Sequence, residues 1–314
     1  NFDRQLKDGQ PLARDPAYTV RYFIVYTLAF VSLFAASMLL ICLCRQHGVT
    51  LAASLLGSLF FVLMLPFLQT IGGYYYDLSE LAFMAAYLVL LPQRHWRWAC
   101  VPLTLLATVN KEAFLFFIAT TLPLCLSYGA GWRGLLRDRT ALAVTALAAT
   151  TSIATHAVMV PAFAHTAGSE TLFWLGHNLA FYADPRSLFR LEQTYGLVVF
   201  AGYSLYTLVV IAGVGIVGLP HLSTRVRVYA GLTALVSVVL LLLFAFPGEM
   251  RNLSFLFPVS VICLGATFDR LLVTMAPRNA VTAPFVDEAR GLGENRLSIE
   301  PKWERLNDYL RADT

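Results

Sequence analysis

Charged residues are scarce in this sequence. Asp, Glu, Lys and Arg make up 13% of its 314 residues, whereas a soluble domain carries about 25%. Hydrophobic residues account for 58% of the chain, and the mean hydropathy is +0.65. This composition excludes an ordinary soluble domain. The net charge of +4 is small and comes from arginines in loops, which argues against nucleic acid as a partner.

Cysteines and known catalytic motifs are also scarce. No pair of cysteines has the CxxC spacing, so we interpret them as small hydrophobic residues rather than as a disulfide framework or metal site. There is no HExxH, nucleophile elbow, P-loop or GxGxxG in a suitable context. The sequence therefore indicates no cofactor and no metal ligand. A requirement for a divalent metal stays an open alternative. The five cysteines are Cys42, Cys44, Cys100, Cys125 and Cys263.

Long apolar runs take up most of the chain. They do not alternate as barrel strands do, and backbone groups inside a bilayer are satisfied most simply in helices. We therefore expect an all-α fold, a polytopic helical membrane protein with about nine membrane segments. We divide the chain into an outer N-terminal segment (1–18), a membrane domain (19–272) with an outer loop (161–196), and a cytoplasmic tail (273–314).

Both ends of the chain carry further expectations. The sequence opens in a polar stretch without Met, so we expect that a preceding helix is missing. In the tail, Trp303, Leu306 and Leu310 recur at helical spacing and predict a short amphipathic helix.

One apolar run is interrupted by Asn110-Lys111-Glu112. Each half of the run is too short for a span, which needs about 20 residues. A Lys or a Glu at membrane depth costs about 2.5–3.5 kcal/mol, so such residues pair or reach an interface. We predict a helical hairpin whose charged tip lies at one membrane face. The alternative is a plain turn with Lys111 extended to the headgroups.

The loop arginines predict the orientation. Loops rich in Lys and Arg stay in the cytoplasm, which places the N-terminal segment, the 72–80 loop, the Lys111 tip, the 161–196 loop and the 249–251 turn on the outer face. The basic loops contain Arg45, Arg94, Arg97, Arg133, Arg137, Arg139, Arg225 and Arg227.

Two further polar clusters belong to this outer face. Asp77 and Glu80 follow three tyrosines and share one face of a helix. The alternative is that Asp77 caps this helix and the tyrosines form an aromatic belt. Glu249-Met250-Arg251 lies between two spans, and Arg offers a planar fork for phosphate or carboxylate. The alternative there is a local ion pair.

The N-terminal segment contributes Asp3, Asp8 and Asp15. Any of these carboxylates could serve as a general base, because a carboxylate accepts a proton from an attacking hydroxyl.

Three short motifs resemble those of the GT-C class of membrane glycosyltransferases and of bacterial multispanning proteins related to it. The resemblance covers residues 1 to about 272, although the paired acids usual in the first outer loop are not clear here. The motifs are Tyr75-Tyr76-Asp77-Leu78-Ser79-Glu80-Leu81, Asn110-Lys111-Glu112-Ala113 and Glu249-Met250-Arg251.

The resemblance implies transfer of a sugar from a polyprenyl-phosphate donor to an envelope glycan or lipid acceptor. It implies a bacterial inner membrane with the active face periplasmic and the C-terminus cytoplasmic. Asp3, Asp77 and Glu80 would be the catalytic carboxylates, and Lys111 and Arg251 would bind the lipid phosphate. The resemblance adds three residues to the donor site: Tyr76, Glu112 and Glu249.

Two other functions remain open on the sequence. Intramembrane charges and broken helices also mark transporters of lipids or solutes, although we find no internal repeat. A non-catalytic membrane subunit of a larger assembly would use the cytoplasmic tail around Trp303 to contact a protein partner.

Overall fold

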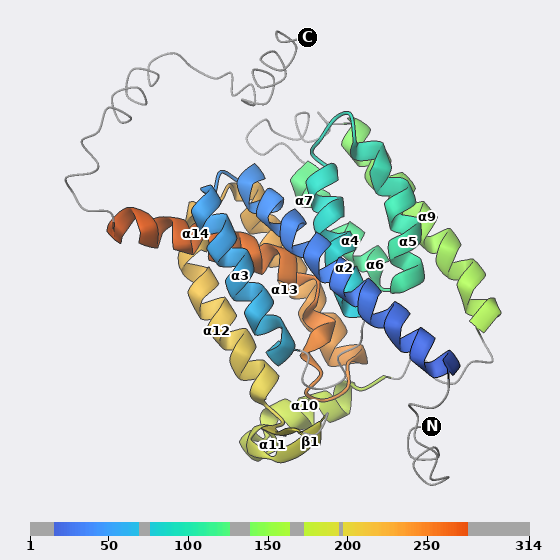
Figure 1. Cartoon of the computed structure of the whole chain (residues 1–314), viewed down its shortest axis with the longest axis vertical. Helices are drawn as coiled ribbons and strands as arrows, with labels where there is room; N and C mark the ends of the chain where they lie inside the picture. The colour runs from blue at the N-terminus through green and yellow to red at the C-terminus, as the bar shows by residue number, and fades with distance from the viewer. Residues whose placement is uncertain (1–15, 69–75, 126–138, 164–172, 195–196, 276–314) are drawn as a thin grey trace. The chain divides into compact units, whose positions relative to one another are not determined.

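The computed structural model describes residues 16–68, 76–125, 139–163, 173–194 and 197–275 (Figure 1). The expectations for Asp3, Asp8 and Asp15, for the first part of the 72–80 loop and for the tail helix lie outside these ranges. One compact unit spans residues 1–271, and a second spans 272–314.

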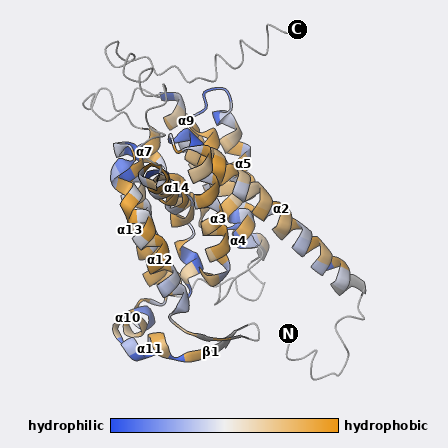
Figure 2. Ribbon diagram, turned by 60° about the vertical axis from the view of Figure 1, so that its left-hand side comes forward, coloured by the Kyte–Doolittle hydropathy of each residue, from blue (hydrophilic) through white to orange (hydrophobic). Residues whose placement is uncertain are grey.

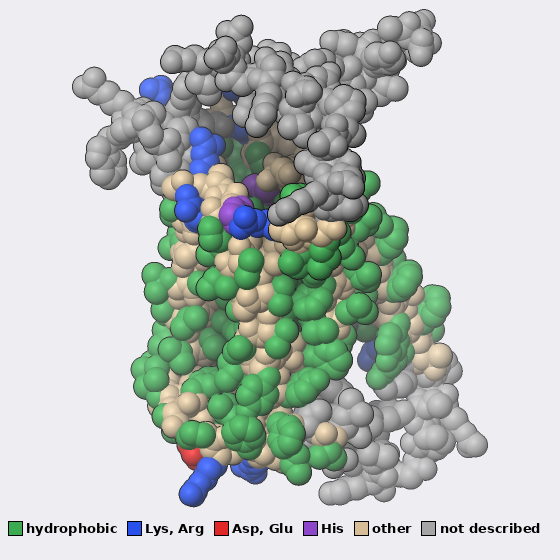
Figure 3. All heavy atoms as spheres, turned by 90° about the vertical axis from the view of Figure 1, so that its left-hand side faces the viewer, with side chains coloured by type: hydrophobic (Ala, Val, Ile, Leu, Met, Phe, Trp, Pro, Cys, Tyr) green, Lys and Arg blue, Asp and Glu red, His purple; other side chains and the backbone are tan. Residues whose placement is uncertain are grey.

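Within these ranges, six helices are long and apolar enough to cross a membrane. Their side chains facing outward are mostly hydrophobic, as in Phe23 and Phe30 of α2, which are each 72% exposed. Figure 3 shows hydrophobic side chains over the visible flank, with charged side chains towards its ends. The chain is therefore a helical multi-pass membrane protein. The six helices are α2 (Pro16–Gln46), α3 (Leu51–Leu68), α9 (Arg139–Phe163), α12 (Tyr203–Gly218), α13 (Thr224–Phe244) and α14 (Leu256–Met275). The span that contains α12 continues through a 3-10 turn to His221.

Four shorter helices occupy the region of the predicted third span and hairpin. α4 (Tyr76–Leu90) has 15 residues and α5 (Cys100–Asn110) has 11. At 1.5 Å per residue they are about 22 and 16 Å long, shorter than a hydrocarbon core of about 30 Å. α6 (Phe114–Thr120) and α7 (Leu122–Cys125) follow. The count of about nine membrane segments stays a prediction.

The predicted outer loop ends at residue 196, which places the start of a membrane span at Leu197, and the structure differs at this point. Instead, β2 (Leu197–Phe200) pairs antiparallel with β1 (Leu191–Thr194), with Leu191 opposite Phe200. The Val-Val-Phe sequence favours a strand, and α12 begins only at Tyr203. Two short helices precede the strands within the predicted outer loop, α10 (Leu175–Ala183) and α11 (Pro185–Phe189).

Glycines allow α14 to lie directly against its neighbours. A Cβ on Gly57 of α3 would lie 2.8 Å from the backbone nitrogen of Gly265. A Cβ on Gly218 of α12 would lie 2.3 Å from the carbonyl oxygen of Cys263. Small residues permit such close helix contacts in membranes, where lipid tails leave little hydrophobic force between helices.

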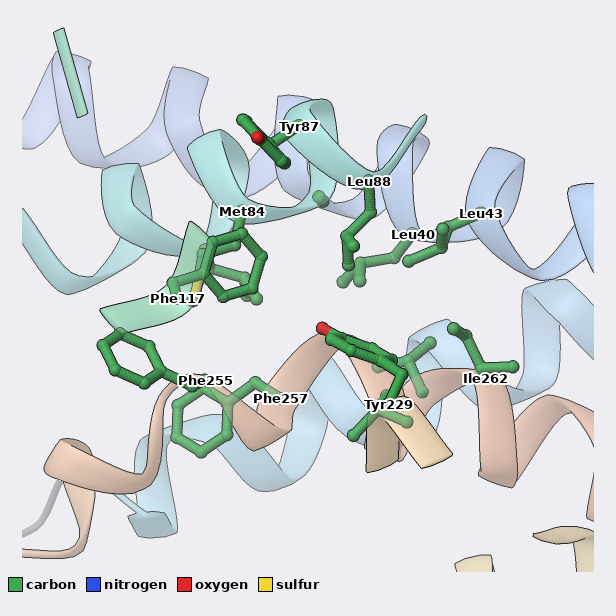
Figure 4. Packing of buried hydrophobic residues seen from close by; sticks show 14 of the residues in the cluster. Leu40, Leu43, Met84, Tyr87, Leu88, Phe117, Tyr229, Phe255, Phe257 and Ile262 are labelled. Atoms are coloured by element: carbon green, nitrogen blue, oxygen red, sulfur yellow. The ribbon is translucent and has the colours of Figure 1, made fainter. Parts of the chain in front are cut away.

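The hydrophobic core lies between α2 and α4 on one side and α13 and α14 on the other (Figure 4). Leu40, Met84, Phe117 and Tyr229 are fully buried there. Short turns connect the ends of the helices that surround this core. They include the 3-10 turn η4 (Met250–Leu253) between α13 and α14. There are two further 3-10 turns in the described ranges. η2 (Arg97–Ala99) precedes α5, and η3 (Leu219–His221) follows α12.

Candidate functional site

Three helix ends meet at one end of the bundle. α4 begins at Tyr76, α5 ends at Asn110, and η4 joins the end of α13 to the start of α14. The amide of Asn110 donates a hydrogen bond to the carbonyl oxygen of Tyr76 at 3.0 Å, which ties α5 to the start of α4. The side chains collected here form what we call the polar cluster: Tyr76, Asp77, Glu80, Lys111, Glu249, Arg251 and Ser254.

Lys111 and Glu80 form one half of the polar cluster. The Lys111 ammonium donates to Glu80 Oε2 at 2.7 Å. The hydroxyl of Ser254 donates to the other carboxylate oxygen, Oε1, at 2.9 Å, and lies 3.4 Å from the Lys111 nitrogen. Glu80 is 1% exposed and the Lys111 side chain 15%. A buried carboxylate is tolerated only when it is paired and hydrogen-bonded in this way.

Arg251 organises the other half. Its guanidinium donates to the Tyr76 hydroxyl at 2.9 Å and lies 3.6 Å from Asp77 Oδ1. It also forms an ion pair with Glu249. Burial disfavours the charged guanidinium, but the hydrogen bond to Tyr76 and the charge of Glu249 outweigh it, so the pKa of Arg251 is raised. Arg251 therefore stays charged at this site.

The local sequence shapes the turn that holds Arg251. α13 ends at Phe244, and Gly248 has φ +84, a conformation that side chains other than glycine rarely adopt. Glu249 Oε2 then accepts a hydrogen bond from the backbone amide of Phe246 at 3.2 Å and another from the side-chain amide of Asn252 at 3.3 Å. The Glu249 carboxylate is thus both a brace for the turn and a partner of Arg251.

A layer of aromatic rings packs beside the Lys111 half of the polar cluster. Phe114 lies three residues after Lys111 in the chain, and Phe255 directly follows Ser254. The ring centroids of Phe114 and Phe117 are 5.2 Å apart, and those of Phe117 and Phe255 are 5.9 Å apart. All three rings are at most 2% exposed. These rings belong to the hydrophobic core next to residues 111 and 254 in the chain.

The structure does not bring Glu112 into the polar cluster. Its side chain is 67% exposed and lies 3.6 Å from Nδ1 of His156 on α9. Lys111 has an extended backbone, with φ −154 and ψ 117, after the end of α5. The two adjacent side chains therefore make separate contacts, Lys111 towards α4 and η4 and Glu112 towards α9.

Ser254 is the member of the cluster that sequence reasoning missed. It lies three residues after Arg251, and the intervening backbone is a 3-10 turn. Residues three apart in such a turn lie on the same side. The same spacing had singled out Asp77 and Glu80, so the Arg251–Ser254 spacing was a usable signal.

The charges of the polar cluster nearly balance. Three carboxylates, those of Asp77, Glu80 and Glu249, surround the cations of Lys111 and Arg251. Within the described ranges, no group of three His, Cys, Asp or Glu side chains is placed to hold a metal ion. The carboxylates of the cluster can exchange protons. The cluster can bind an anion only if Lys111 or Arg251 moves from its carboxylate partner to that anion.

No protein-family model, curated protein or solved structure matches this chain.

Proposed function

We propose that the chain is a GT-C-like glycosyltransferase that uses a polyprenyl-phosphate sugar, with the polar cluster as its active site. One observation carries the proposal: a lysine, an arginine and three carboxylates from α4, α5 and η4 meet at one end of a membrane bundle. A lipid-linked phosphate presents its charge at that depth. The acceptor would be an envelope glycan or lipid, on the periplasmic face of a bacterial inner membrane.

The chemistry would be a displacement at the sugar anomeric carbon. The acceptor hydroxyl attacks, a new glycosidic bond forms, and the bond from the anomeric carbon to the phosphate oxygen breaks. A carboxylate takes the hydroxyl proton as general base. The bond electrons leave with the polyprenyl phosphate, whose developing charge needs preorganised cations.

The paired charges indicate how the site would work. When the donor phosphate arrives, Lys111 would turn from Glu80 to the phosphate. Glu80 is buried and would then have lost its cation, and a buried carboxylate without a counter-ion binds a proton more readily. Phosphate binding would thus prepare Glu80 as the base. Arg251 would remain with Glu249 and Asp77 and direct its remaining donors to the phosphate, while Asp3 stays a predicted catalytic carboxylate.

Sugar transfer in lipid nanodiscs tests this proposal. A short-chain polyprenyl phosphate carrying a radiolabelled hexose or pentose is supplied with an extract of envelope glycolipids. We expect label in the acceptor, a loss of at least 100-fold in Lys111→Ala and Glu80→Gln, and normal transfer in His156→Gln. Full activity in the Lys111→Ala and Glu80→Gln variants would refute the assigned roles. Absence of both transfer and donor binding with every labelled sugar would refute the function.

A non-catalytic membrane subunit is the second candidate, and the charge balance favours it. Each cation already contacts a buried carboxylate, as in a purely structural ion-pair network. Replacing Lys111 by Met and Glu80 by Leu together would then leave assembly intact, because a buried pair is often replaceable by apolar residues. Co-purification of protein partners with the double variant separates the candidates, since an enzyme would lose transfer.

A transporter receives less support. Transporter sites are also formed by the ends of broken helices, commonly in chains with an internal repeat, and we find no such repeat in this sequence. Uptake of labelled lipid or sugar into proteoliposomes is the corresponding measurement.

A further inference from the structure

Residues 173–194 and 197–200, which we call the α10–β2 module, lie beyond the ends of α12 and α13 (Figure 2). Hydrogen bonds connect the module to the bundle. The side-chain amide of Asn178, which is fully buried, donates to the carbonyl oxygens of Leu241, Leu242 and Ala245 at 2.8–3.2 Å. These carbonyls lie at the end of α13 and at the residue after it, where a helix leaves carbonyl groups without helical donors. The carbonyl of Leu241 also accepts a hydrogen bond from the backbone amide of Ala245 at 3.2 Å. The backbone amide of Gly202 donates to Leu188 at 2.9 Å.

One face of its β-hairpin is apolar and exposed. Leu191 lies opposite Phe200 in the register, and Val198 is two residues before Phe200. Side chains opposite each other or two apart lie on the same face of a sheet. Leu191 is 62% exposed, Val198 67% and Phe200 45%. A two-stranded hairpin alone is marginally stable in water, so this face needs a cover.

The apolar face continues into the membrane-facing side of α12. The ring centroid of Phe189 lies 6.4 Å from that of Phe200 and 6.0 Å from that of Tyr206 on α12. Tyr206, Val209 and Val210 share one face of α12 and are 37%, 61% and 51% exposed. Since α12 is one of the six helices that can cross a membrane, lipid covers that face. The hairpin extends the same surface past the helix end.

We propose that the α10–β2 module lies in the membrane interface, with the hairpin face of Leu191, Val198 and Phe200 against the lipid acyl chains. The unpaired strand edges cannot enter hydrocarbon, because their backbone groups would lose water without gaining a partner. The hairpin therefore lies flat, with its apolar face buried about 5–10 Å into the boundary between headgroups and acyl chains, as the apolar faces of interfacial amphipathic helices are. The occupant of this surface is lipid, independently of the function of the polar cluster.

Arg190 provides a matched control within the module. Its backbone is extended, with φ −64 and ψ 132, and successive side chains of an extended chain point to opposite sides. Arg190 stands between Phe189 and Leu191, so it points away from the apolar face. It is exposed and on this proposal faces headgroups and water.

Nitroxide accessibility tests the proposal on the full chain in nanodiscs of phosphatidylethanolamine and phosphatidylglycerol. Cys42, the one exposed cysteine among the described residues, is first replaced by Ala. Labels are then placed singly by Val198→Cys, Phe200→Cys, Arg190→Cys and, as a lipid-facing reference, Val209→Cys. Collisions with molecular oxygen report lipid, and collisions with a water-soluble nickel chelate report solvent.

We expect the labels at 198 and 200 to resemble the reference at 209, with oxygen accessibility severalfold above nickel accessibility. The label at 190 should show the reverse. Nickel accessibility at 198 and 200 equal to that at 190 would overturn the proposal. Exclusion of both reagents at 198 and 200 would also overturn it, because a protein surface would then cover the hairpin. The reference at 209 shows that each preparation is folded in lipid.

Discussion

Lys111 and Glu112 are neighbours in the sequence, yet they make two very different contacts, and the histidine beside Glu112 is charged only when it is protonated. Lys111 lies 2.7 Å from Glu80, whose side chain is 1% exposed. Glu112 lies 3.6 Å from His156, and these two side chains are 67% and 49% exposed. Water and salt screen the second pair but hardly reach the first. The comparison shows that the environment, rather than the residue types, decides which of two adjacent charges matters.

The largest effect is expected from breaking the buried pair on one side only. Glu80→Ala leaves the Lys111 ammonium buried without its carboxylate, and removing one partner of a buried pair costs about 3–5 kcal/mol. We expect a strong loss of thermal stability in detergent micelles. The double variant Glu80→Leu with Lys111→Met should recover most of it. Equal destabilisation in the single and double variants would contradict the pairing.

Arg251→Ala should have the next largest effect. It removes the hydrogen bond to Tyr76 and the ion pairs with Asp77 and Glu249. Hydrogen bonds to charged groups contribute about 1.5–3 kcal/mol each. Because Arg presents several donors in a planar fork, Arg251→Lys should restore only part of the loss. Thermal unfolding of the two variants measures this, and full recovery with Lys would show that only the charge is needed.

Ser254→Ala should have a smaller effect that still exceeds that of any change at Glu112. It removes one hydrogen bond to Glu80 Oε1 and leaves a buried carboxylate oxygen with fewer donors, at a cost of about 1–3 kcal/mol. Ser254→Thr keeps the hydroxyl and serves as the control in the same unfolding measurement. If Ser254→Ala left the stability unchanged, Ser254 would not be a member of the cluster.

Glu112→Gln should have the smallest effect. An exposed ion pair contributes about 0–1 kcal/mol and weakens with salt. We expect a stability within this range of the parent, and no difference at all at about 1 M salt, where the screening length is about 3 Å. Chemical unfolding at low and high salt is the measurement. A loss as large as that of Glu80→Ala would erase the contrast between the two pairs.

Much of the fold could be predicted from the composition and the apolar runs. The helical membrane class needed only the scarcity of charge and the length of the runs. The start of α12 could not be predicted, because Leu197–Phe200 is as apolar as the span it precedes. Only the pairing with Leu191–Thr194 makes it a strand.

The residues of the polar cluster were predicted unevenly, and for physical reasons. Asp77 and Glu80 share a helix face because of their spacing, so local geometry indicates them. Glu112 was expected at the same site because it adjoins Lys111, but the extended backbone at Lys111 separates their contacts. Ser254 is uncharged, and its one signal was the three-residue spacing from Arg251, which indicates a shared side only once the 3-10 turn between them is known.

The sequence by itself determined that this chain is helical and lies in a membrane, because apolar runs of this length cannot stay in water and must satisfy their own backbone. It also determined that any polar chemistry would come from the few charged breaks between the runs. Only the tertiary structure decided which breaks meet. α4 and α5 are close together in the chain, but Ser254 lies 143 residues after Lys111, and its contact with them depends on packing between helices that no local pattern records.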